Sequence, residues 1–574
     1  MTTVAENIVA HLAANGVRRI YGIPGDSLNG LTDALRKDGT IDWTLVRHEE
    51  AAAFAAAGEA AITGRLAVCA GSCGPGNLHL INGLYDAHRS RVPVLAIAAQ
   101  IPSDEIGSNY FQETHPQKLF ADCSSYVELV SRPEQMPRVL QLAMRSAIEN
   151  RDVAVVVIPG DVALAEAASD QVATITPTTP TVVLSSSELG RAAEILNQGK
   201  KVTILAGAGT AGAHQELIKT AEVLAAPIVH PLRGKEHVEY DNPYDVGMTG
   251  LIGFSSGYRA MENSDTLLML GTDFPYQQFY PRQAKIIQVD IRGDQLGRRT
   301  HLDVGLVGDT KETLQALLPR LTPHRNRRHL TSSLDHYRRS RKKLDDLATD
   351  DHGRSPLHPQ YVARLVDQLA ADDAVFIPDV GSPVVWAARY LTMNGRRRLI
   401  GSFNHGSMAN ALPQAIGVQS VDRSRQVVAL SGDGGLTMML GELITLAQHR
   451  LPVKIIVFNN SSLNFVELEM KASGFVTYGT GLDNPDFAKV ADAVGILGVK
   501  VTKPKELKPA LKQAFAHDGP ALIDVSTVRQ ELTIPPAITA EQLKGFTLYA
   551  IRTVLSGRGD ELLDLASTNR RQLL

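Results

Sequence analysis

The sequence contains few of the residues on which several protein classes depend. Its 574 residues include only three cysteines, Cys69, Cys73 and Cys123, too few for a disulfide framework. Cys69 and Cys73 have no second pair of metal ligands near them in the sequence, so a zinc site is not expected. The composition therefore gives no indication of a disulfide-stabilised or zinc-binding protein.

A charge excess of one sign and long apolar runs are also missing. The formal net charge is -3, so the chain lacks the strongly basic balance of a nucleic-acid-binding protein. No apolar run is long enough to span a bilayer. The first residues, MTTVAENIVAHLAANGV, have the pattern of an amphipathic helix and lack the charged start and long apolar core of a signal peptide. We therefore expect a cytoplasmic enzyme or binding protein with no nucleic-acid partner.

The chain is instead rich in short apolar strands, each followed by a glycine-rich turn and a helical pattern. Runs of Val, Ile and Leu of this kind are typical of parallel strands buried on both faces. They include RLAVCAG, VPVLAIAAQ, VAVVVIP, KVTILAG, DTLLMLG, KIIQVDI, RQVVALSG and LPVKIIVFNN. The alternation of strand, loop and helix predicts doubly wound α/β domains with parallel sheets.

Two polar segments divide the chain. Residues 173–183, ATITPTTPTVV, are rich in threonine and proline and predict an extended linker. Residues 321–343 are polar and basic and predict a solvated connector. We place three doubly wound domains at residues 1–182, 183–334 and 335–530, followed by a tail at 531–574 that has no strand pattern.

A candidate site for a diphosphate and a metal ion lies in the third domain. Gly432-Asp433-Gly434-Gly435 follows one predicted strand, and Asn459-Asn460 follows the next. The carboxyl ends of parallel strands share a sheet edge, where open α/β sheets bind their ligands. Glycine N–H groups and a helix N-terminus favour phosphate, while the oxygens of Asp433 and Asn460 are hard ligands of the kind that Mg²⁺ prefers.

A second candidate site lies in the first domain, in the stretch RHEEAAAFAAA at residues 47–57. Glu49 and Glu50 open an alanine-rich helical pattern. Acids in a first turn complement the helix dipole by about 0.3–1 kcal/mol, and this is one explanation of the pair. The other is a role in acid–base chemistry, and the stretch alone leaves both open.

Several longer segments resemble the thiamine-diphosphate enzymes of the pyruvate oxidase and acetohydroxyacid synthase group. They are RHEEAAAFAA, GSCGPGNLHLINGLYDAH, YFQETHPQ, SFNHGSMANALPQAIG, SGDGG and NNSSLNFVELEM. The resemblance covers nearly the whole chain and is greatest to the flavin-containing, quinone-dependent pyruvate oxidases of bacteria. It implies a pyrimidine-binding domain, a central FAD-binding domain and a diphosphate-binding domain, in that order. It also implies that thiamine diphosphate lies between the first domain of one chain and the third domain of another, in a homodimer at least and usually a tetramer.

The resemblance assigns roles around the thiamine diphosphate. Glu49 is implied to hydrogen-bond N1′ of the aminopyrimidine, which activates the C2 proton of the thiazolium, while Glu50 keeps the role of a first-turn acid. Met408 is implied to lie between the two rings, with Gly406 and Ser407 against the aminopyrimidine. Mg²⁺ is implied to bind Asp433, Asn460 and the backbone carbonyl of Ser462. The other implied contacts of the cofactor are Gly434, Gly435, Ser461, Leu463, Asn464, Phe465 and Val466.

The middle domain contains one weak and several stronger signals for a flavin. Gly207-x-Gly209-x-x-Gly212 follows a strand, which by itself is a weak dinucleotide fingerprint. Asp290 ends a predicted strand, where a carboxylate can reach a ribose hydroxyl, and Asp309 has a similar position. Each signal alone also fits an ordinary turn. Together with the resemblance they predict FAD, bound through Gly207, Gly209, Arg233, Thr249, Gly250, Leu251, Ile252, Thr272, Asp273, Phe274, Pro275, Tyr276, Asp290 and Asp309.

The resemblance also implies a substrate pocket and a reaction. The pocket residues are Val380, Phe111, Gln112, Phe465, Val466 and Glu469, with Phe465 between the thiamine cofactor and the flavin. A small apolar pocket with a few polar groups suits a short 2-oxo acid, and pyruvate is the expected substrate. The implied reaction yields acetate and CO₂, and two electrons pass through FAD to ubiquinone in the membrane.

The tail has apolar residues at helical spacing, among them Phe546, Tyr549, Val554 and Leu555. The resemblance implies that the tail covers the active site and binds a phospholipid surface, which places the protein on the cytoplasmic face of the cell membrane. The sequence departs from the family pattern at its end, where Arg570 and Arg571 stand in place of a tryptophan. Basic residues still favour an anionic membrane.

Three other functions stay open. The first is an acetohydroxyacid synthase, in which FAD is structural and a second 2-oxo acid replaces the electron acceptor; the membrane-type tail argues against it. The second is a phosphate-dependent pyruvate oxidase that forms hydrogen peroxide. The third is a non-catalytic, lipid-docking protein of the same fold, against which the presence of Glu49, Asp433 and Asn460 argues.

Overall fold

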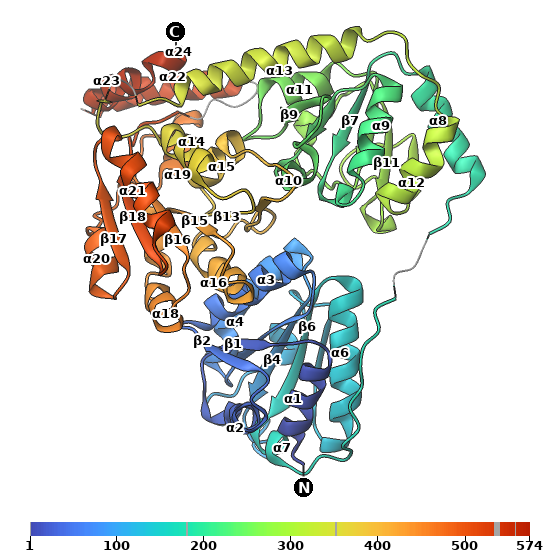
Figure 1. The fold of residues 1–574 in the computed structure, drawn as a ribbon, viewed down its shortest axis with the longest axis vertical. Coiled ribbons are helices and arrows are strands. Elements are labelled where there is room, and N and C mark those ends of the chain that lie inside the picture. Colours follow the sequence, from blue (N-terminus) through green and yellow to red (C-terminus); the bar gives the residue numbers. More distant parts are fainter. Residues whose placement is uncertain (1, 179–181, 351–352, 533–539, 557, 574) are drawn as a thin grey trace.

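The computed structural model of the chain describes residues 2–178, 182–350, 353–532, 540–556 and 558–573. Three parallel sheets of six strands each, all covered by helices, follow one another along the sequence (Figure 1). The predicted class, an α/β chain with three doubly wound parallel sheets, is confirmed. In Figure 1 the first domain lies at the bottom, the middle domain at the upper right and the third domain at the left.

The first domain has the strand order β2-β1-β3-β4-β6-β5. Its helix α1 begins with a capping box, in which Thr3 and Glu6 satisfy each other's backbone N–H groups. The strands are β1 (Arg19–Gly22), β2 (Asp42–Leu45), β3 (Ala67–Gly71), β4 (Val94–Gln100), β5 (Tyr126–Leu129) and β6 (Val153–Pro159). The helices are α1 (Val4–Ala14), α2 (Asn29–Asp38), α3 (Glu49–Thr63), α4 (Pro75–Ser90), α5 (Pro116–Leu119), α6 (Met136–Asn150) and α7 (Gly160–Leu164).

The third domain repeats this topology, with the order β14-β13-β15-β16-β18-β17. In both sheets the order reverses beside the first strand, which places a ligand crevice at the carboxyl ends of β13 and β15. The strands are β13 (Val375–Pro378), β14 (Arg398–Leu399), β15 (Val427–Gly432), β16 (Lys454–Asn459), β17 (Leu497–Val501) and β18 (Ala521–Ser526). The helices are α14 (Pro359–Leu369), α15 (Ser382–Tyr390), α16 (Ala411–Val421), α17 (Asp433–Met438), α18 (Glu442–His449), α19 (Asn464–Ala472), α20 (Phe487–Ala493) and α21 (Pro504–Ala516).

The middle domain has a different order, β9-β8-β7-β10-β11-β12. Numbered along the chain this is 3-2-1-4-5-6, the order of dinucleotide-binding sheets, whose crevice lies between the first and fourth strands. Here these are β7 and β10. The strands are β7 (Val202–Ala206), β8 (Ile228–His230), β9 (Asp245–Met248), β10 (Thr266–Leu270), β11 (Lys285–Asp290) and β12 (Val304–Val307). The helices are α8 (Ser186–Gln198), α9 (His214–Leu224), α10 (Lys235–Val238), α11 (Ser255–Glu262) and α12 (Thr310–Leu317).

The basic segment that predicts a solvated connector is largely a helix, α13 (Arg328–Leu347), and the boundary at 334/335 falls inside it. Its sparse apolar residues Leu330, Leu334, Tyr337 and Leu344 recur at helical spacing and pack on the cores of two domains. The Arg341 guanidinium lies 5.4 Å from the Tyr390 ring centroid, so the helix also contacts the third domain. α13 therefore links the middle and third domains and is not a free connector.

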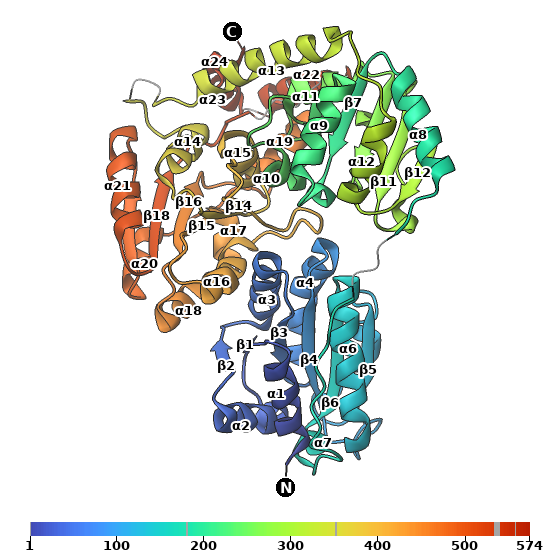
Figure 2. The ribbon, with the colours of Figure 1, turned by 45° about the vertical axis from the view of Figure 1, so that its right-hand side comes forward.

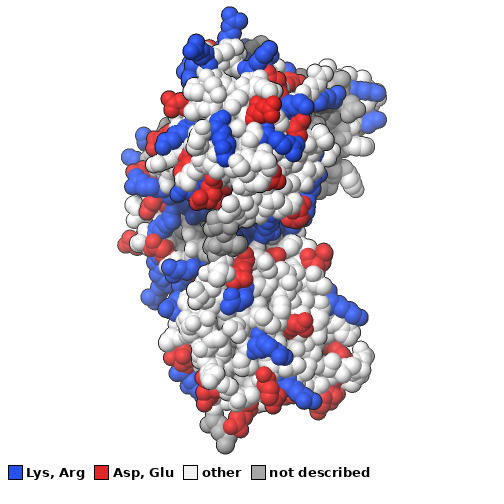
Figure 3. Space-filling view, turned by 90° about the vertical axis from the view of Figure 1, so that its right-hand side faces the viewer, with Lys and Arg blue, Asp and Glu red and all other residues white. Residues whose placement is uncertain are grey.

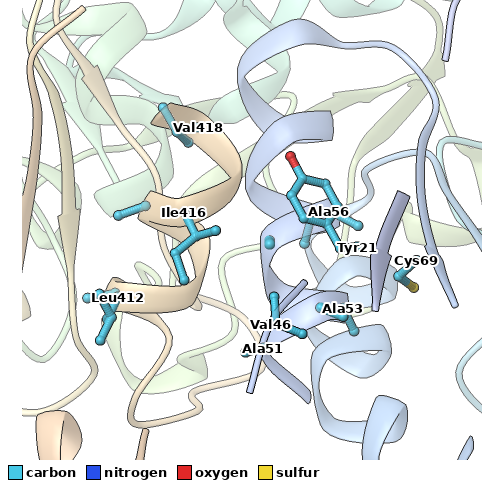
Figure 4. Packing of buried hydrophobic residues seen from close by; sticks show 14 of the residues in the cluster. Tyr21, Val46, Ala51, Ala53, Ala56, Cys69, Leu412, Ile416 and Val418 are labelled. Carbon is cyan, nitrogen blue, oxygen red and sulfur yellow. The ribbon is translucent and has the colours of Figure 1, made fainter. Parts of the chain in front are cut away.

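The first and third domains share one hydrophobic core. The alanine-rich helix α3 packs on α16, and Figure 4 shows the two helices side by side, with Leu412, Ile416 and Val418 on α16. A Cβ atom added at Gly58 would lie 2.5 Å from the Gln414 carbonyl oxygen, so the helices approach too closely for a larger residue there. The alanine run thus serves helix packing, and it fixes the first domain against the third (Figure 2).

The tail forms the helices α22 (Ala540–Leu555), α23 (Gly559–Thr568) and α24 (Arg570–Leu573). α22 lies against α19 of the third domain, and Gly545 faces the Ala472 carbonyl too closely for any Cβ. Arg552 Nη1 donates to the Gly474 carbonyl at 2.6 Å. None of the described helices is both long enough and apolar enough to cross a membrane.

Candidate active site

The Asp433 carboxylate is the centre of the predicted diphosphate and metal edge. It is the first residue of α17, only 2% exposed, and burial raises the pKa of its carboxyl group. Oδ2 accepts hydrogen bonds from Ser461 N at 2.7 Å, Asn460 N at 3.1 Å and Asn484 Nδ2 at 2.8 Å. Oδ1 accepts one from Gly434 N at 2.9 Å. The fold therefore brings together the two motifs that the sequence places on separate strands.

The loop after β16 shapes the second half of this edge. Asn460 Oδ1 accepts the Ser462 N–H at 3.0 Å, and Ser461 adopts a left-handed backbone with φ 55°. Leu463 N bonds to Thr480 O at 2.8 Å, so the loop is held by a second chain segment. The carboxylate, the amide oxygen and this fixed loop are a donor set of the kind that Mg²⁺ takes, and the predicted ligands Asp433, Asn460 and Ser462 fit it.

The absence of side chains at Gly434 and Gly435 leaves space beside the glycine turn, and any larger residue at either position would fill it. A Cβ atom at Gly434 would lie 2.7 Å from Leu463 Cδ2 and 3.5 Å from Met408 Cε. Met408 thus reaches the glycine turn, as expected for a side chain beneath the cofactor. A Cβ at Gly435 would overlap the Asp379 carboxylate. The space kept free by Gly434 and Gly435, with Met408 beside it, fits a bound thiamine diphosphate.

Asp379 is a residue that the sequence interpretation missed. It follows β13, is 1% exposed, and burial raises its pKa to about 7. Oδ1 accepts the Ala411 N–H at 3.1 Å, and Oδ2 has no hydrogen-bond partner among the described residues. Ala409, just after Met408, has a left-handed backbone with φ 66°. The carboxyl group of Asp379 therefore holds the strained loop that carries Met408. In the sequence, the only sign of this role was an acidic residue directly after the apolar run VFIP.

Glu49 and Glu50 have different surroundings. Glu49 is the first residue of α3, 6% exposed, and its Oε2 lies 2.9 Å from His79 Nδ1. Glu50 is less buried, and its Oε1 accepts a hydrogen bond from Asn82 Nδ2 at 2.7 Å. The rings of His48 and His79 stack at 4.3 Å, and ligand atoms of His48, Glu49 and His79 lie within 4.8 Å of one another. His79 was not singled out from the sequence, although its segment was.

Hydrogen bonds connect the surroundings of Glu49 to the loop that carries Met408. Asn82 Nδ2 donates to Ser407 Oγ at 2.9 Å, and Asn82 Oδ1 lies 2.8 Å from His405 Nε2. On the other side, Arg47 N donates to Glu442 Oε1 at 3.0 Å. These contacts join the first and third domains within one chain. The arrangement of the cofactor across two chains stays a prediction.

The two predicted flavin loops meet at the crevice of the middle sheet. A Cβ at Gly209 would lie 2.6 Å from Gly271 Cα, and one at Gly207 would lie 2.5 Å from Gly271 O. These glycines therefore allow the loops after β7 and β10 to touch, a packing reason that holds with or without a ligand. The Thr249 hydroxyl is 2% exposed and has no hydrogen-bond partner among the described residues. An orphaned hydroxyl at this edge fits a bound polar ligand such as FAD.

The three predicted flavin acids differ in their partners. Asp273 forms an ion pair with Arg299 at 2.9 Å. Asp290 ends β11 and accepts the Arg292 N–H at 2.9 Å, and burial raises its pKa. Asp309 is the N-cap of α12 and accepts the Lys311 N–H at 2.8 Å, a structural task that accounts for it without a flavin.

Two predicted flavin segments reach the third domain. The backbone carbonyl of Ile252 accepts a hydrogen bond from Arg389 Nε at 3.1 Å, and Ile252 packs on the same core cluster as Phe465. Burial and the nearby Glu469 carboxylate raise the pKa of Tyr276, so Tyr276 lies close to α19. Gly250, Leu251, Phe274 and Pro275 belong to the same two segments, and a Cβ at Gly250 would lie 3.0 Å from the Phe274 ring.

The predicted substrate residues are spread over two domains. Val380 follows Asp379 and is half-buried, while Val466 is 38% exposed. Asn464 starts α19 and is buried. Gln112 has a left-handed backbone with φ 63° and accepts a hydrogen bond from Cys73 Sγ at 3.3 Å. Phe111 is 79% exposed, so the fold of one chain does not enclose it.

Comparison with known proteins identifies the family. The descriptions "Thiamine pyrophosphate enzyme, N-terminal TPP binding domain", "central domain" and "C-terminal TPP binding domain" match residues 2–119, 189–317 and 379–525 in turn. The chain belongs to the thiamine pyrophosphate enzyme family and is a thiamine-diphosphate-dependent enzyme. Mg²⁺ is typical of this family.

Three relatives extend along nearly the whole chain. A putative thiamine pyrophosphate-containing protein, YdaP, of Bacillus subtilis is 36% identical over 562 residues, 97% of each chain. A pyruvate oxidase of Lactiplantibacillus plantarum is 31% identical over 527 residues, 90% of this chain and 87% of the relative. The large subunit of acetolactate synthase isozyme 2 of Escherichia coli is 32% identical over 556 residues, 94% of this chain and 99% of the relative. The relatives thus include both an oxidase and a carboligase.

Proposed function

We propose that the enzyme oxidises pyruvate to acetate and CO₂ and passes the electrons through FAD to a membrane quinone. The observation that carries this proposal is the approach of the two predicted flavin segments to the thiamine site. Ile252 packs on the core cluster of Phe465, and Tyr276 lies near Glu469. A flavin in the crevice of the middle sheet would then lie beside the helix that borders the substrate.

The chain's own residues define how the cofactor is held and activated. Bound thiamine diphosphate supplies the electron sink for decarboxylation of a 2-oxo acid. Asp433 and Asn460 would hold the metal ion of its diphosphate, and Met408 would support its rings. Glu49 would hydrogen-bond the aminopyrimidine nitrogen through Oε1, the oxygen that His79 leaves free. Because Glu49 is buried, water does not compete for this hydrogen bond.

The test is pyruvate-dependent reduction of an artificial electron acceptor, with the products identified. We expect acetate and CO₂ as products and bleaching of the flavin absorbance. We also expect two electrons to be transferred to the acceptor for each pyruvate consumed. Acetolactate without reduction of the acceptor would instead identify a carboligase, the activity named for the relative from Escherichia coli. Acetyl phosphate and hydrogen peroxide would identify a phosphate-dependent oxidase. Cofactor binding without turnover would identify a non-catalytic protein.

The tail supports the membrane part of the proposal. Its polar side holds it to the third domain: Asn569 Nδ2 donates to Gln530 O at 2.6 Å, and Arg558 Nη1 donates to Thr477 O at 2.7 Å. Its outer side carries apolar residues that are more than half exposed, namely Leu543, Ile551, Val554, Leu555 and Leu563. Exposed Lys544 and Arg570 accompany them. An apolar face with basic neighbours suits the surface of an anionic bilayer.

The tail also lies beside the predicted metal edge. A cavity of about 640 Å³ is lined on one side by Asn459, Asn460 and Ser461 and on the other by Asp564, Ser567 and Thr568 of α23. Helix α23 carries three leucines, Leu562, Leu563 and Leu565. None of the three is buried, and Leu563 is 74% exposed, so the docked tail already presents apolar surface.

Replacing Ile551 and Leu555 with glutamine is expected to weaken binding to anionic phospholipid vesicles by about 10-fold or more, since a fully buried side chain of this size contributes about 1.5–3 kcal/mol. Glutamine keeps the helix propensity and the net charge. The measurement is vesicle co-sedimentation, together with dye and quinone reduction. The matched control is Leu142→Gln, at a leucine of α6 that is 47% exposed. Equal vesicle binding by the double variant and the wild type would contradict a membrane role of this face.

A further inference from the structure

Two arginines, Arg91 and Arg233, lie where the first domain adjoins the middle domain. Arg91 follows the last residue of α4 and has a left-handed backbone with φ 57°. Arg233 lies in the short 3₁₀ turn Leu232–Gly234 after β8, and its Nη2 donates to the Ser90 carbonyl at 3.0 Å. Burial and the charge of Arg91 lower the pKa of Arg233, so the two guanidinium groups lie close enough to repel each other.

Arg91 has no counter-charge of its own. In the part of the chain that the structure describes, its guanidinium makes no hydrogen bond and no ion pair, although the residue is half-buried. Burial and the charge of Arg292 lower the pKa of Arg91. Arg233, with five N–H donors, has one described hydrogen bond. Removing guanidinium groups from water without supplying acceptors costs free energy, so the pair is incomplete as it stands.

The acids nearest to Arg91 are committed elsewhere. Asp273 and Asp290 lie within electrostatic reach of it, at the carboxyl ends of β10 and β11. Asp273 is paired with Arg299, however, and Asp290 accepts the backbone N–H of Arg292. A third acid that acts on Arg91, Asp294, is paired with Arg298 at 3.3 Å, and none of the three carboxylates is within ion-pair distance of Arg91. Arg91 therefore faces the edge of the middle sheet at which dinucleotides bind in this strand order, with its donors unused.

The same junction shows further basic and unpaired groups. Arg292 donates to the Asn150 carbonyl at the end of α6, so a second middle-domain arginine contacts a helix end of the first domain. The orphaned hydroxyl of Thr249 lies just after β9, on the carboxyl edge of the same sheet. Figure 3 shows Lys and Arg side chains, with Asp and Glu among them, on a face that includes the waist between the upper and lower halves of the molecule.

We propose that Arg91, together with Arg233, binds the diphosphate of a dinucleotide in the crevice of the middle domain, so that the first domain forms one wall of that site. Two guanidinium groups match the charge and the oxygen geometry of a diphosphate. Attraction of both groups to the bound anion would offset the repulsion between them. The inference rests on the proposed FAD-dependent function. It adds that the flavin nucleotide ties the first domain to the middle domain.

The test is FAD binding by flavin-depleted protein that retains thiamine diphosphate, followed by flavin fluorescence. Arg91→Asn is expected to weaken FAD binding by about 10- to 100-fold, the range that the loss of a charge-assisted hydrogen bond gives. Asparagine tolerates the left-handed backbone of this position. Arg91→Lys keeps the positive charge but loses the planar set of N–H donors of a guanidinium group, and it is expected to bind FAD with intermediate affinity. The affinity of the wild type is expected to fall more steeply with salt than that of Arg91→Asn.

The matched control is Arg89→Gln, which removes the same charge from an exposed position two residues earlier and is expected to bind FAD like the wild type. Competition with ADP and with inorganic phosphate separates the possible ligands. Strong competition by ADP supports a dinucleotide diphosphate, whereas competition by phosphate alone overturns it. Wild-type FAD binding that is unchanged in Arg91→Asn and Arg91→Lys overturns this inference and leaves the proposed function standing. A wild type that binds no FAD overturns both.

Discussion

Replacing Glu49 with glutamine is expected to slow exchange of the C2 proton of bound thiamine diphosphate by about 10²- to 10⁴-fold, the usual contribution of a positioned acid–base group. Glutamine has the same size and fits the 6% exposed position at the start of α3. It cannot hold and share a proton as a carboxyl group does. The measurement is hydrogen–deuterium exchange at C2 by rapid quenching and NMR, on protein with a full complement of cofactor.

Glu50→Gln is the matched control because it makes the same change at the next residue. Its new side chain still offers an oxygen to Asn82 Nδ2, so the link to the third domain persists. We expect normal C2 exchange in this variant and equal cofactor content in both. A Glu49→Gln protein that exchanges C2 at nearly the wild-type rate would show that the carboxyl group of Glu49 does not activate the cofactor.

The strands and the diphosphate edge could be predicted because local sequence determines both. Apolar runs such as VPVLAIAAQ are unfavourable anywhere except in a sheet covered on both faces, and this run became β4. Strand β15 ends at Gly432, directly before Asp433, and β16 ends at Asn459, directly before Asn460. Once both motifs follow parallel neighbours, the pairing of β15 with β16 brings them to one edge.

Other features depend on contacts between distant segments and left little trace in the sequence. The structural role of Asp379 depends on a hydrogen bond from the backbone of a loop more than 30 residues away, and no local sequence pattern reveals such a contact. In α13 only a few apolar residues stand among many charges, so its amphipathic period was too sparse to recognise. Which side of α22 packs on the third domain also depends on Gly545, whose missing side chain lets that side approach α19. The orphaned guanidinium of Arg91 is likewise visible only once two domains adjoin.

Replacing Asp433 with asparagine is expected to raise the Mg²⁺ concentration needed for thiamine diphosphate binding by at least ~10- to 100-fold, since even indirect partners of a metal site are typically worth this much. In the predicted metal site the carboxylate would supply one hard oxygen and a negative charge to Mg²⁺, and asparagine would keep only the oxygen. The measurement is cofactor binding titrated against Mg²⁺, by quenching of intrinsic fluorescence. Asparagine is the informative change because its one remaining oxygen can still accept the N–H groups of Asn460 and Ser461, which an alanine would leave without any acceptor.

The control for this experiment separates the metal from the architecture of the loop. Asn484→Ala removes one donor to Asp433 Oδ2 but leaves the carboxylate and its three backbone donors in place. A purely structural role of Asp433 predicts that both variants lose thermal stability and that neither changes the Mg²⁺ requirement. The metal role predicts a changed Mg²⁺ requirement in Asp433→Asn that greatly exceeds the one in Asn484→Ala. If Asp433→Asn binds the cofactor at the Mg²⁺ concentration that suffices for the wild type, the carboxylate is not a metal ligand and the assignment of this edge is wrong.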